Sequence, residues 1–161
     1  MMPVEDTLVV RDFVEDDVSP LLELMLSLAE FEGYHEQFAV TESELRSRGL
    51  GDDPQFKALV AEYSGSPGKL AGMAVYYFVP YTFDLRPDLI LKELFVADTV
   101  RSAGVGGALM QRLTSRARAA NCRRIKWLVL PDNVRAKKFY TSLGAKHDSS
   151  WETWTMQLSR N

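Results

Sequence analysis

The stretch KELFVADTVRSAGVGGALM, residues 92–110, decides the fold that we expect for this chain. It begins inside an apolar run, Leu89–Val96, that is typical of a central β-strand. A glycine-rich turn, Arg101–Gly107, follows and leads into residues with helical spacing. Its three glycines remove side chains where a backbone must approach another group closely. Because the N–H groups and the dipole of a helix N-terminus favour an anion, this turn predicts a pyrophosphate site.

Three other interpretations of the glycine-rich turn are weighed against this one. A Walker loop requires Gly-Lys-Ser/Thr after a spacing of four, and the turn lacks that sequence. A dinucleotide fold usually shows G-x-G-x-x-G after the first strand of the chain, and neither condition is met. A tight turn that serves packing alone remains open on this motif by itself.

Periodicity along the chain predicts a mixed α/β domain with hairpins early and strand–helix alternation late. The predicted order is β-α-α-β-β-β-α-β-α-β, with a mixed, mostly antiparallel central sheet flanked by about four helices, and one domain spans residues 1–161. The predicted strands are Leu8–Asp12, Phe56–Tyr63, Leu70–Val79, Leu89–Val96, Arg124–Leu130 and Trp151–Leu158. The predicted helices run from Asp16 or Asp17 to about Gly33, from Thr41 to Arg48, over Gly104–Ala120 and over Asn133–Leu143.

Composition excludes several classes of protein. The 161 residues are 46% hydrophobic and 25% charged, which is typical of one globular domain. One cysteine, Cys122, rules out an internal disulfide and is expected to be a buried or half-buried thiol. Two separated histidines do not give metal-ligand spacing, so we expect no metal. No signal peptide or membrane-spanning pattern is present, which predicts a cytoplasmic protein with no membrane partner.

Charge is distributed unevenly although the net charge is only −3. Residues 1–60 hold 14 acidic and 4 basic residues, whereas residues 101–161 hold 3 acidic and 12 basic residues. This division suits a polyanionic small molecule beside the C-terminal half and a cation beside the N-terminal half, or solvated helix faces with no partner. Nucleic acid is not expected as a partner, because the overall balance is acidic and no base-stacking motif is present.

A second motif, NVRAKKFYTSLGA at residues 133–145, follows the strand predicted after the glycine-rich turn. The pair of motifs, R-x-x-G-x-G and then N-x-x-A-x-x-F-Y-x-x-x-G-A, resembles the GNAT superfamily of N-acetyltransferases. The resemblance extends along nearly the whole chain and is greatest to the diamine, polyamine and thialysine acetyltransferase branch. Less specific stretches support this branch, namely Leu28–Glu32, Thr41–Leu45, Met73–Phe78, Glu93–Val96, Gly144–Ala145 and Glu152–Trp154.

The resemblance implies acetyl-CoA as the cosubstrate and assigns roles to residues of both motifs. Phe95 and Val96 would pair by backbone with the pantetheine arm. A backbone N–H near Val96 would polarise the thioester carbonyl. Tyr140 would give a proton or a strong hydrogen bond to the departing thiolate. The expected cofactor-binding residues are Phe95, Val96, Arg101, Ser102, Ala103, Gly104, Val105, Gly106, Gly107, Asn133, Ala136, Lys137 and Tyr140, with Lys138 as an alternative to Lys137.

The acceptor is expected to be a small cationic amine, which must lose a proton before it can attack the thioester. Glu93 is the first candidate for the general base, because it lies on the strand expected to carry the thioester. Glu32 and Glu152 match positions that the polyamine branch uses around the substrate, with Phe31 beside Glu32 as a further substrate-binding candidate, and both glutamates could instead be ordinary surface carboxylates. The branch commonly has two adjacent acids in this strand, and here the first is Lys92. If Lys92 faces the amine pocket, it repels a polycation and favours a smaller or partly anionic acceptor, such as an amino acid. If it points outward, it is an ordinary surface lysine.

Other assignments remain open at the level of sequence. The acceptor could be an amino acid or a protein or peptide amine, and a non-catalytic acyl-CoA sensor would share the same fold. The branch also implies a homodimer, to which Trp151 and Trp154 in the last predicted strand would contribute.

Overall fold

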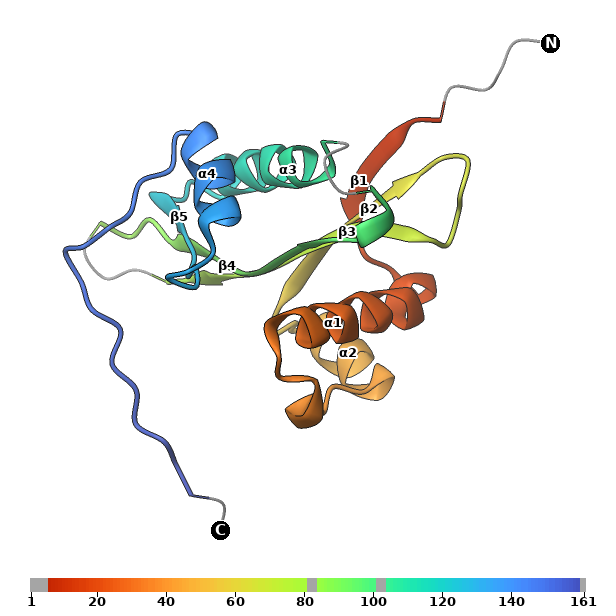
Figure 1. The fold of residues 1–161 in the computed structure, drawn as a ribbon, viewed down its shortest axis with the longest axis horizontal. Coiled ribbons are helices and arrows are strands. Elements are labelled where there is room, and N and C mark those ends of the chain that lie inside the picture. The colour runs from red at the N-terminus through yellow and green to blue at the C-terminus, as the bar shows by residue number, and fades with distance from the viewer. Residues whose placement is uncertain (1–5, 81–83, 101–103, 160–161) are drawn as a thin grey trace. The chain divides into compact units, whose positions relative to one another are not determined.

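The computed structural model describes residues 6–80, 84–100 and 104–159, in two compact units, Met1–Trp127 and Leu128–Asn161. The first unit contains a five-stranded sheet and three α-helices, and the second contains one α-helix (Figure 1). The elements are β1 (Leu8–Asp12), α1 (Val18–Glu32), α2 (Glu42–Gly49), β2 (Lys57–Tyr63), β3 (Leu70–Val79), β4 (Asp88–Val96), α3 (Val105–Ala119), β5 (Arg124–Lys126) and α4 (Val134–Ser142). Short 3-10 turns cover Glu15–Asp17, His35–Gln37 and Asp98–Val100.

The predicted fold class is confirmed as a mixed, mostly antiparallel sheet with four α-helices in the described residues. The strands lie in the order β1-β2-β3-β4-β5, and the first three neighbouring pairs are antiparallel. β5 is parallel to β4, but its ladder joins only Asp88–Ile90 to Arg124–Lys126. The strand predicted over Arg124–Leu130 is therefore shorter than expected, and β5 covers only the first third of β4.

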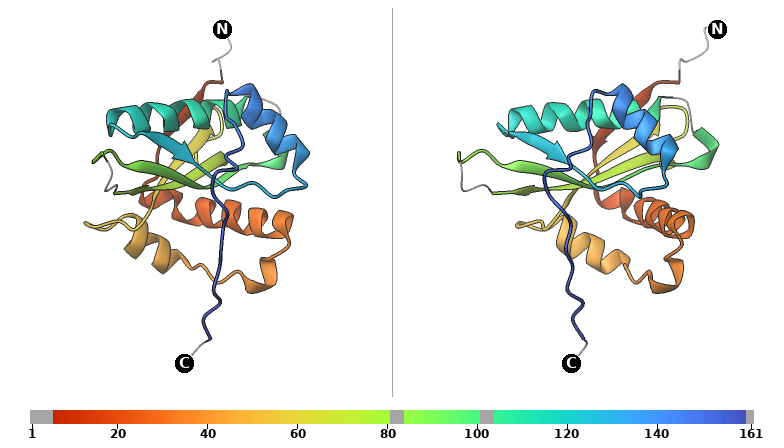
Figure 2. Two further views of the ribbon diagram at one scale, coloured as in Figure 1. Left: turned by 90° about the vertical axis from the view of Figure 1, so that its left-hand side faces the viewer. Right: turned by 60° about the vertical axis from the view of Figure 1, so that its left-hand side comes forward.

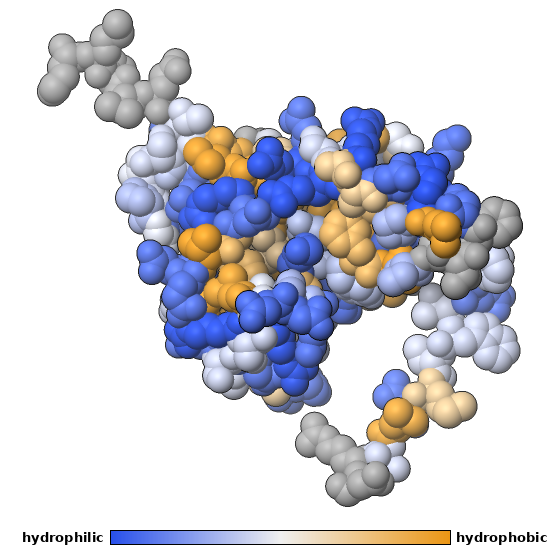
Figure 3. All heavy atoms as spheres, turned by 180° about the vertical axis from the view of Figure 1, so that it is seen from behind, coloured by the Kyte–Doolittle hydropathy of each residue, from blue (hydrophilic) through white to orange (hydrophobic). Residues whose placement is uncertain are grey.

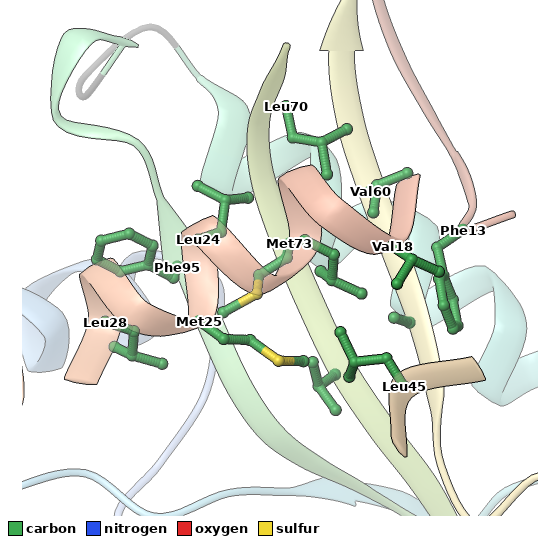
Figure 4. Close-up of a cluster of buried hydrophobic side chains, with 13 residues drawn as sticks. Phe13, Val18, Leu24, Met25, Leu28, Leu45, Val60, Leu70, Met73 and Phe95 are labelled. Carbon is green, nitrogen blue, oxygen red and sulfur yellow. The ribbon is translucent and has the colours of Figure 1, made fainter. Parts of the chain in front are cut away.

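Helices cover both faces of this sheet (Figure 2). The face under α1 and α2 holds the main hydrophobic cluster, in which Met73, Val75 and Phe95 of the sheet meet Met25 and Leu45 of the helices (Figure 4). The opposite face is closed by α3 through fully buried residues such as Leu109 and Leu113. Burial of these apolar side chains is the main source of the fold's stability.

One glycine fixes how closely α3 approaches the sheet. A Cβ atom built on Gly72 of β3 would lie 3.0 Å from the Phe95 carbonyl oxygen and 3.0 Å from a Val105 methyl group. It would also lie 3.1 Å from a methyl group of Leu109. The absence of a side chain at position 72 therefore lets the first turns of α3 rest directly on β3 and β4.

The helix ends agree with the predicted signals to within one residue. Thr41 caps α2 by accepting a hydrogen bond from the Glu44 N–H at 3.2 Å. Gly33 ends α1 in the left-handed conformation, with φ 84°. Asp17 precedes α1 as predicted, but its side chain does not cap this helix. Its carboxylate accepts instead from the Val14 N–H at 2.8 Å and from the Arg11 guanidinium at 2.7 Å.

A β-bulge interrupts β4 at Lys92. Val75 of β3 is opposite Glu93 and Tyr76 is opposite Leu91, so Lys92 is the extra residue in the ladder. A bulge changes the face on which the following side chains lie and increases the twist of the strand. Leu91 accordingly shares the α3 face with Tyr76, whereas Glu93 shares the α1 face with Val75.

The second unit contains α4 and an extended C-terminal segment. α4 begins at the cap Asn133, whose Oδ1 accepts from the Ala136 N–H at 3.0 Å. The helix ends at Ser142 and is stopped by Gly144, φ 89°, where the N–H groups of Gly144 and Ala145 donate to the carbonyls of Thr141 and Tyr140. These are the two bonds of a Schellman motif, so the predicted helix stop at Gly144 is confirmed.

The strand predicted over Trp151–Leu158 is wrong. These residues form no strand, and their side chains are exposed, including Trp154 (86%) and Met156 (86%). Figure 3 shows orange, hydrophobic side chains near the end of this segment and paler ones before them. The alternation of apolar and polar residues suits a strand, but alternation alone supplies no ladder of hydrogen bonds, and the sheet has no sixth strand in the described residues.

Candidate functional site

The bulge on β4 places two charged side chains at the wall of one cavity. This cavity has a volume of ≈ 350 Å³ and lies in the first unit. Its wall is formed by Met25 in the middle of α1, the segment between α1 and α2, α2 itself, Phe56, Val75 and the bulged part of β4. Both Glu93 and the solvent-exposed Lys92 line it.

Glu93 lies in an environment that disfavours its charged form. Burial raises the pKa of the Glu93 carboxyl, the positive charge of Lys92 lowers it, and the negative charge of Glu32 raises it. Burial is the largest of these causes, so the pKa of Glu93 is raised overall. A carboxylate with a raised pKa is a stronger base than an ordinary exposed glutamate, and it faces a cavity large enough for a small molecule.

Tyr34 is a residue of the cavity wall that sequence reasoning missed. Its N–H donates to the Ala29 carbonyl at 2.9 Å, across the left-handed Gly33 that ends α1. Burial raises the pKa of the Tyr34 phenol, and the charges of Glu93 and Glu32 raise it further. A signal was present, because the residue after a helix-ending glycine commonly packs back on the last turn of the helix.

The structure brings Glu32 into electrostatic range of Glu93, as its effect on the Glu93 pKa shows. Glu32 is the last residue of α1 and is exposed, and Phe31 beside it is 62% exposed. Neither residue belongs to the cavity wall. These two predicted substrate residues therefore lie at the end of the helix that borders the cavity.

The N-terminus of α3 is the described part of the predicted pyrophosphate site. Gly104 precedes the helix in the left-handed conformation, φ 83°, and the Ala108 N–H donates to its carbonyl at 3.0 Å. The N–H groups of Val105, Gly106 and Gly107 precede this first helical hydrogen bond. A Cβ atom on Gly107 would meet nothing within 4 Å. Arg101, Ser102 and Ala103 lie outside the described residues.

Phe95 and Val96 form the end of β4. They pair with Met73 and Gly72 of β3, and the Phe95 side chain is buried in the cluster under α1. The ladder to β5 ends at Ile90, two residues before the bulge. The half of β4 that carries Glu93, Phe95 and Val96 therefore pairs with β3, whereas the pairing with β5 has already ended.

The second unit holds the remaining predicted residues. Tyr140 is half-buried in the last turns of α4, with its ring centroid 5.3 Å from that of Phe139. Ala136 is half-buried in α4. The Lys137 ammonium donates to the Pro131 carbonyl at 2.6 Å, and Lys138 is exposed. Glu152 is exposed and accepts a hydrogen bond from the Trp154 indole at 3.1 Å.

Cys122 is half-buried, as predicted, and burial raises the pKa of its thiol. This shift disfavours the thiolate that a nucleophilic cysteine requires. Within residues 6–80, 84–100 and 104–159, no group of three or more His, Cys, Asp or Glu side chains is arranged to hold a metal ion. No helix in that part of the chain has the length and apolar character needed to cross a membrane.

Comparison with known proteins decides the family. The sequence pattern of the Acetyltransferase (GNAT) family matches residues 20–145, which include the bulged strand, the glycine-rich turn and α4. The chain belongs to the GNAT family of acetyltransferases. The resemblance that the two motifs predicted is confirmed, and the chain is an N-acetyltransferase.

Curated relatives of this GNAT acetyltransferase carry the names of thialysine and spermidine/spermine acetyltransferases. It is 31% identical to the thialysine N-epsilon-acetyltransferase of Bos taurus over 150 residues, which cover 90% of this chain and 88% of the relative. It is also 32% identical over 149 residues to the human spermidine/spermine N(1)-acetyltransferase-like protein 1, a match that covers 90% of this chain and 21% of that protein.

Solved structures show the same fold. An aminoglycoside acetyltransferase from an uncultured soil metagenomic sample matches with a TM-score of 0.77 and 20% identity. The match covers 95% of this chain and 99% of that structure. At this identity the likeness supports the fold alone.

Proposed function

We propose that this GNAT acetyltransferase transfers the acetyl group of acetyl-CoA to a small cationic amine, such as a diamine, a polyamine or a thialysine-like compound. The observation that carries the proposal is the cavity of ≈ 350 Å³ with Glu93 in its wall. A carboxylate attracts an ammonium group and can also take its proton, and both actions are needed before the amine can attack. The names of the two curated relatives support an amine acceptor of this size.

Glu93 acts as the general base in this proposal. It takes a proton from the acceptor ammonium, directly or through a water molecule, and the neutral nitrogen then attacks the thioester carbonyl. A backbone N–H near Val96 stabilises the negative charge that develops on the carbonyl oxygen. As the carbon–sulfur bond breaks, Tyr140 supplies a proton to the departing thiolate, and the extra proton of the acetylated nitrogen passes to the tyrosinate, so that the products are the amide and free CoA and the phenol is restored.

The described residues fit acetyl-CoA at two places. The three N–H groups at the start of α3 provide donors for a diphosphate, and the open space beside Gly107 allows it to approach the backbone. The half of β4 that β5 leaves uncovered suits a pantetheine arm running along Phe95 and Val96. Arg101, Ser102, Ala103, Asn133, Ala136 and Lys137 complete the proposed cofactor set.

Acetyl transfer can be tested with a panel of amines. The protein is incubated with acetyl-CoA and one amine per reaction. The amines are spermidine, putrescine, thialysine, lysine and a basic peptide, and the products are identified by mass spectrometry. We expect acetylation of a small amine. Acetylation of the peptide alone would instead assign a protein or peptide acceptor, and tight CoA binding without transfer to any amine would assign an acyl-CoA sensor.

The role of Tyr140 predicts a separation of turnover from binding. Tyr140→Phe keeps the ring and removes the phenolic proton, so kcat should fall by about 10²-fold or more while the Kd for acetyl-CoA stays within a factor of about 3. Calorimetry and steady-state kinetics measure the two quantities. Phe139→Tyr serves as the matched control on the neighbouring ring, and full turnover in Tyr140→Phe would remove the proposed role of the phenol.

The diphosphate site predicts an effect of adding one methyl group. Gly107→Ala places a Cβ where nothing lies within 4 Å, so the melting temperature should not fall. The methyl group would nevertheless occupy the approach to the helix N-terminus, and the Kd for acetyl-CoA should rise by about 10-fold, which corresponds to about 1.4 kcal/mol. Unchanged affinity in a stable Gly107→Ala protein would place the diphosphate elsewhere.

The resemblance also supports a cytoplasmic homodimer as part of the proposal. Trp151 and Trp154 are exposed and offer an apolar contact surface. Sedimentation of the full chain and of Trp154→Ser would test this, because a dimer that uses the C-terminal segment should weaken in the variant.

A further inference from the structure

We propose that Lys92 makes this cavity selective for acceptor amines that also carry a carboxylate, so that amino acids with a side-chain amine are preferred over polyamines. The inference rests on the proposed function, in which Glu93 receives the acceptor ammonium. It goes further by assigning the neighbouring residue a role in substrate choice.

The bulge gives the cavity a pair of opposite charges on adjacent residues. In a regular strand, neighbouring side chains lie on opposite faces of the sheet. Here Lys92 is the extra residue opposite the Val75–Tyr76 step, and both Lys92 and Glu93 line the cavity. A cation and an anion thus stand side by side in one wall.

Neither of these charges is matched by another side chain. Among the described residues, the Lys92 ammonium and the Glu93 carboxylate make no hydrogen bond, and neither belongs to an ion pair within 4.0 Å. Their effect on each other is the electrostatic one seen in the Glu93 pKa. Both groups therefore remain available to a ligand.

The other charges of the wall compensate each other. Glu44 and Arg48 are one helical turn apart in α2 and form an ion pair at 3.5 Å. With Lys92 and Glu93, the wall carries two acidic and two basic residues. Glu32 at the end of α1 adds one negative charge nearby. This balance differs from the acid-rich wall that a compound with three or four ammonium groups would require.

A diamino acid matches this arrangement of charges. Its reacting ammonium would approach Glu93, and its carboxylate would approach Lys92, so each unmatched charge of the wall gains a partner. A linear polyamine offers only positive charges, and Lys92 repels one of them. The selectivity therefore arises from an attractive and a repulsive contribution of the same side chain.

Two pairs of substrates isolate the carboxylate. Lysine and cadaverine differ only by the α-carboxylate, as do ornithine and putrescine. For the unmodified protein we expect kcat/KM to be higher for the amino acid of each pair. Lys92→Gln should lower that ratio by about 10-fold, since an ion pair with a charged ligand is lost, and Lys92→Glu should invert the preference.

Controls separate this inference from the proposed function. Lys69→Gln changes an exposed lysine of the β2–β3 turn and should leave the ratio unchanged. The KM for acetyl-CoA should be the same in both Lys92 variants, because only the acceptor side is altered. A ratio that does not respond to Lys92→Gln would overturn the inference while acetyl transfer itself stands. Transfer to spermidine but to none of these four amines would also overturn the inference, whereas absence of transfer to any small amine, spermidine and thialysine included, would overturn the proposed function.

Discussion

The two halves of β4, on either side of the bulge at Lys92, belong to one strand but have different tasks. The first half, Asp88–Leu91, pairs with β3 along its length and with β5 from Asp88 to Ile90. Its buried Asp88 accepts from the Arg124 guanidinium at 3.2 Å, and Leu91 is 3% exposed under α3. The second half, Glu93–Val96, pairs with β3 beyond the end of the β5 ladder and lines the cavity with a partly buried, unmatched carboxylate.

The difference shows that one extra residue in a strand can place a core side chain on one face of the sheet and a reactive carboxylate on the other. Without the bulge, strict alternation would place Glu93 on the same face as Leu91, under α3 and among apolar side chains. With it, the carboxylate reaches the cavity while the apolar pattern on both sides of the bulge still fills the two cores. We therefore expect a substitution at Leu91, before the bulge, to affect stability and a substitution at Glu93, after it, to affect catalysis.

The largest effect is expected for Glu93→Gln. Loss of the general base should lower kcat/KM by about 10²–10⁴-fold, with little change in acetyl-CoA affinity. In the unmodified protein, kcat/KM should rise with pH as the Glu93 carboxyl, whose pKa is raised by burial, loses its proton. Glu93→Gln should lose that pH-dependent rise. A variant with normal turnover would show that another group takes the proton.

A second effect is expected on the other side of the bulge. Leu91→Ala removes buried methyl groups opposite Tyr76 and should lower the free energy of unfolding by about 2–5 kcal/mol. The folded fraction should keep its kcat and KM, since Leu91 lies outside the cavity wall. Val79→Ala, at an exposed position of β3, is the matched control and should change stability by no more than about 0.5 kcal/mol. A Leu91→Ala protein that is stable but inactive would contradict the division of β4.

The smallest effect concerns the cost of keeping Glu93 charged. The pKa of Glu93 is higher in the folded than in the unfolded chain, so stability is greatest below the unfolded pKa and is lost as the pH rises through the folded pKa. Glu93→Gln should therefore be more stable than the unmodified protein at neutral pH and equal to it near pH 3. Each kcal/mol would appear as about 2–4 °C in the melting temperature of a chain of this size.

Thermal melts at a series of pH values measure this difference. Glu36→Gln, at an exposed position beyond α1, is the control and should show no pH-dependent gain. A Glu93→Gln protein that melts below the unmodified one at neutral pH would indicate that the carboxylate is matched by another group.

Sequence predicted most of the fold because its signals were local. These signals depend only on neighbouring residues, and the structure confirms them. They are the cap at Thr41, the helix stops at Gly33 and Gly144, and the apolar strands. The strand over Trp151–Leu158 was predicted wrongly, because a strand also needs a partner and alternation does not report one. For the same reason β5 ends at Lys126 instead of Leu130.

The candidate site was predicted in part. Glu93 was found from the chemistry of its strand, but the bulge that aims it is a property of the pairing between β3 and β4, and one sequence does not contain that register. The orientation of Lys92 stayed open for the same reason. Tyr34 was missed because an uncharged side chain outside the two motifs carries no chemical signal of its own, although the glycine before it already indicated a residue folded back on α1.

The bare backbone at Gly72 has a consequence for the cosubstrate. Only the missing side chain allows the start of α3 to lie against β3 and the end of β4, with tolerances of a few tenths of an ångström. The missing side chain at position 72 therefore sets the distance between the amides at the start of α3 and the strand that carries Phe95 and Val96. Alanine at position 72 would change the distance between the two regions proposed to bind acetyl-CoA, although the alanine itself would not touch the cosubstrate.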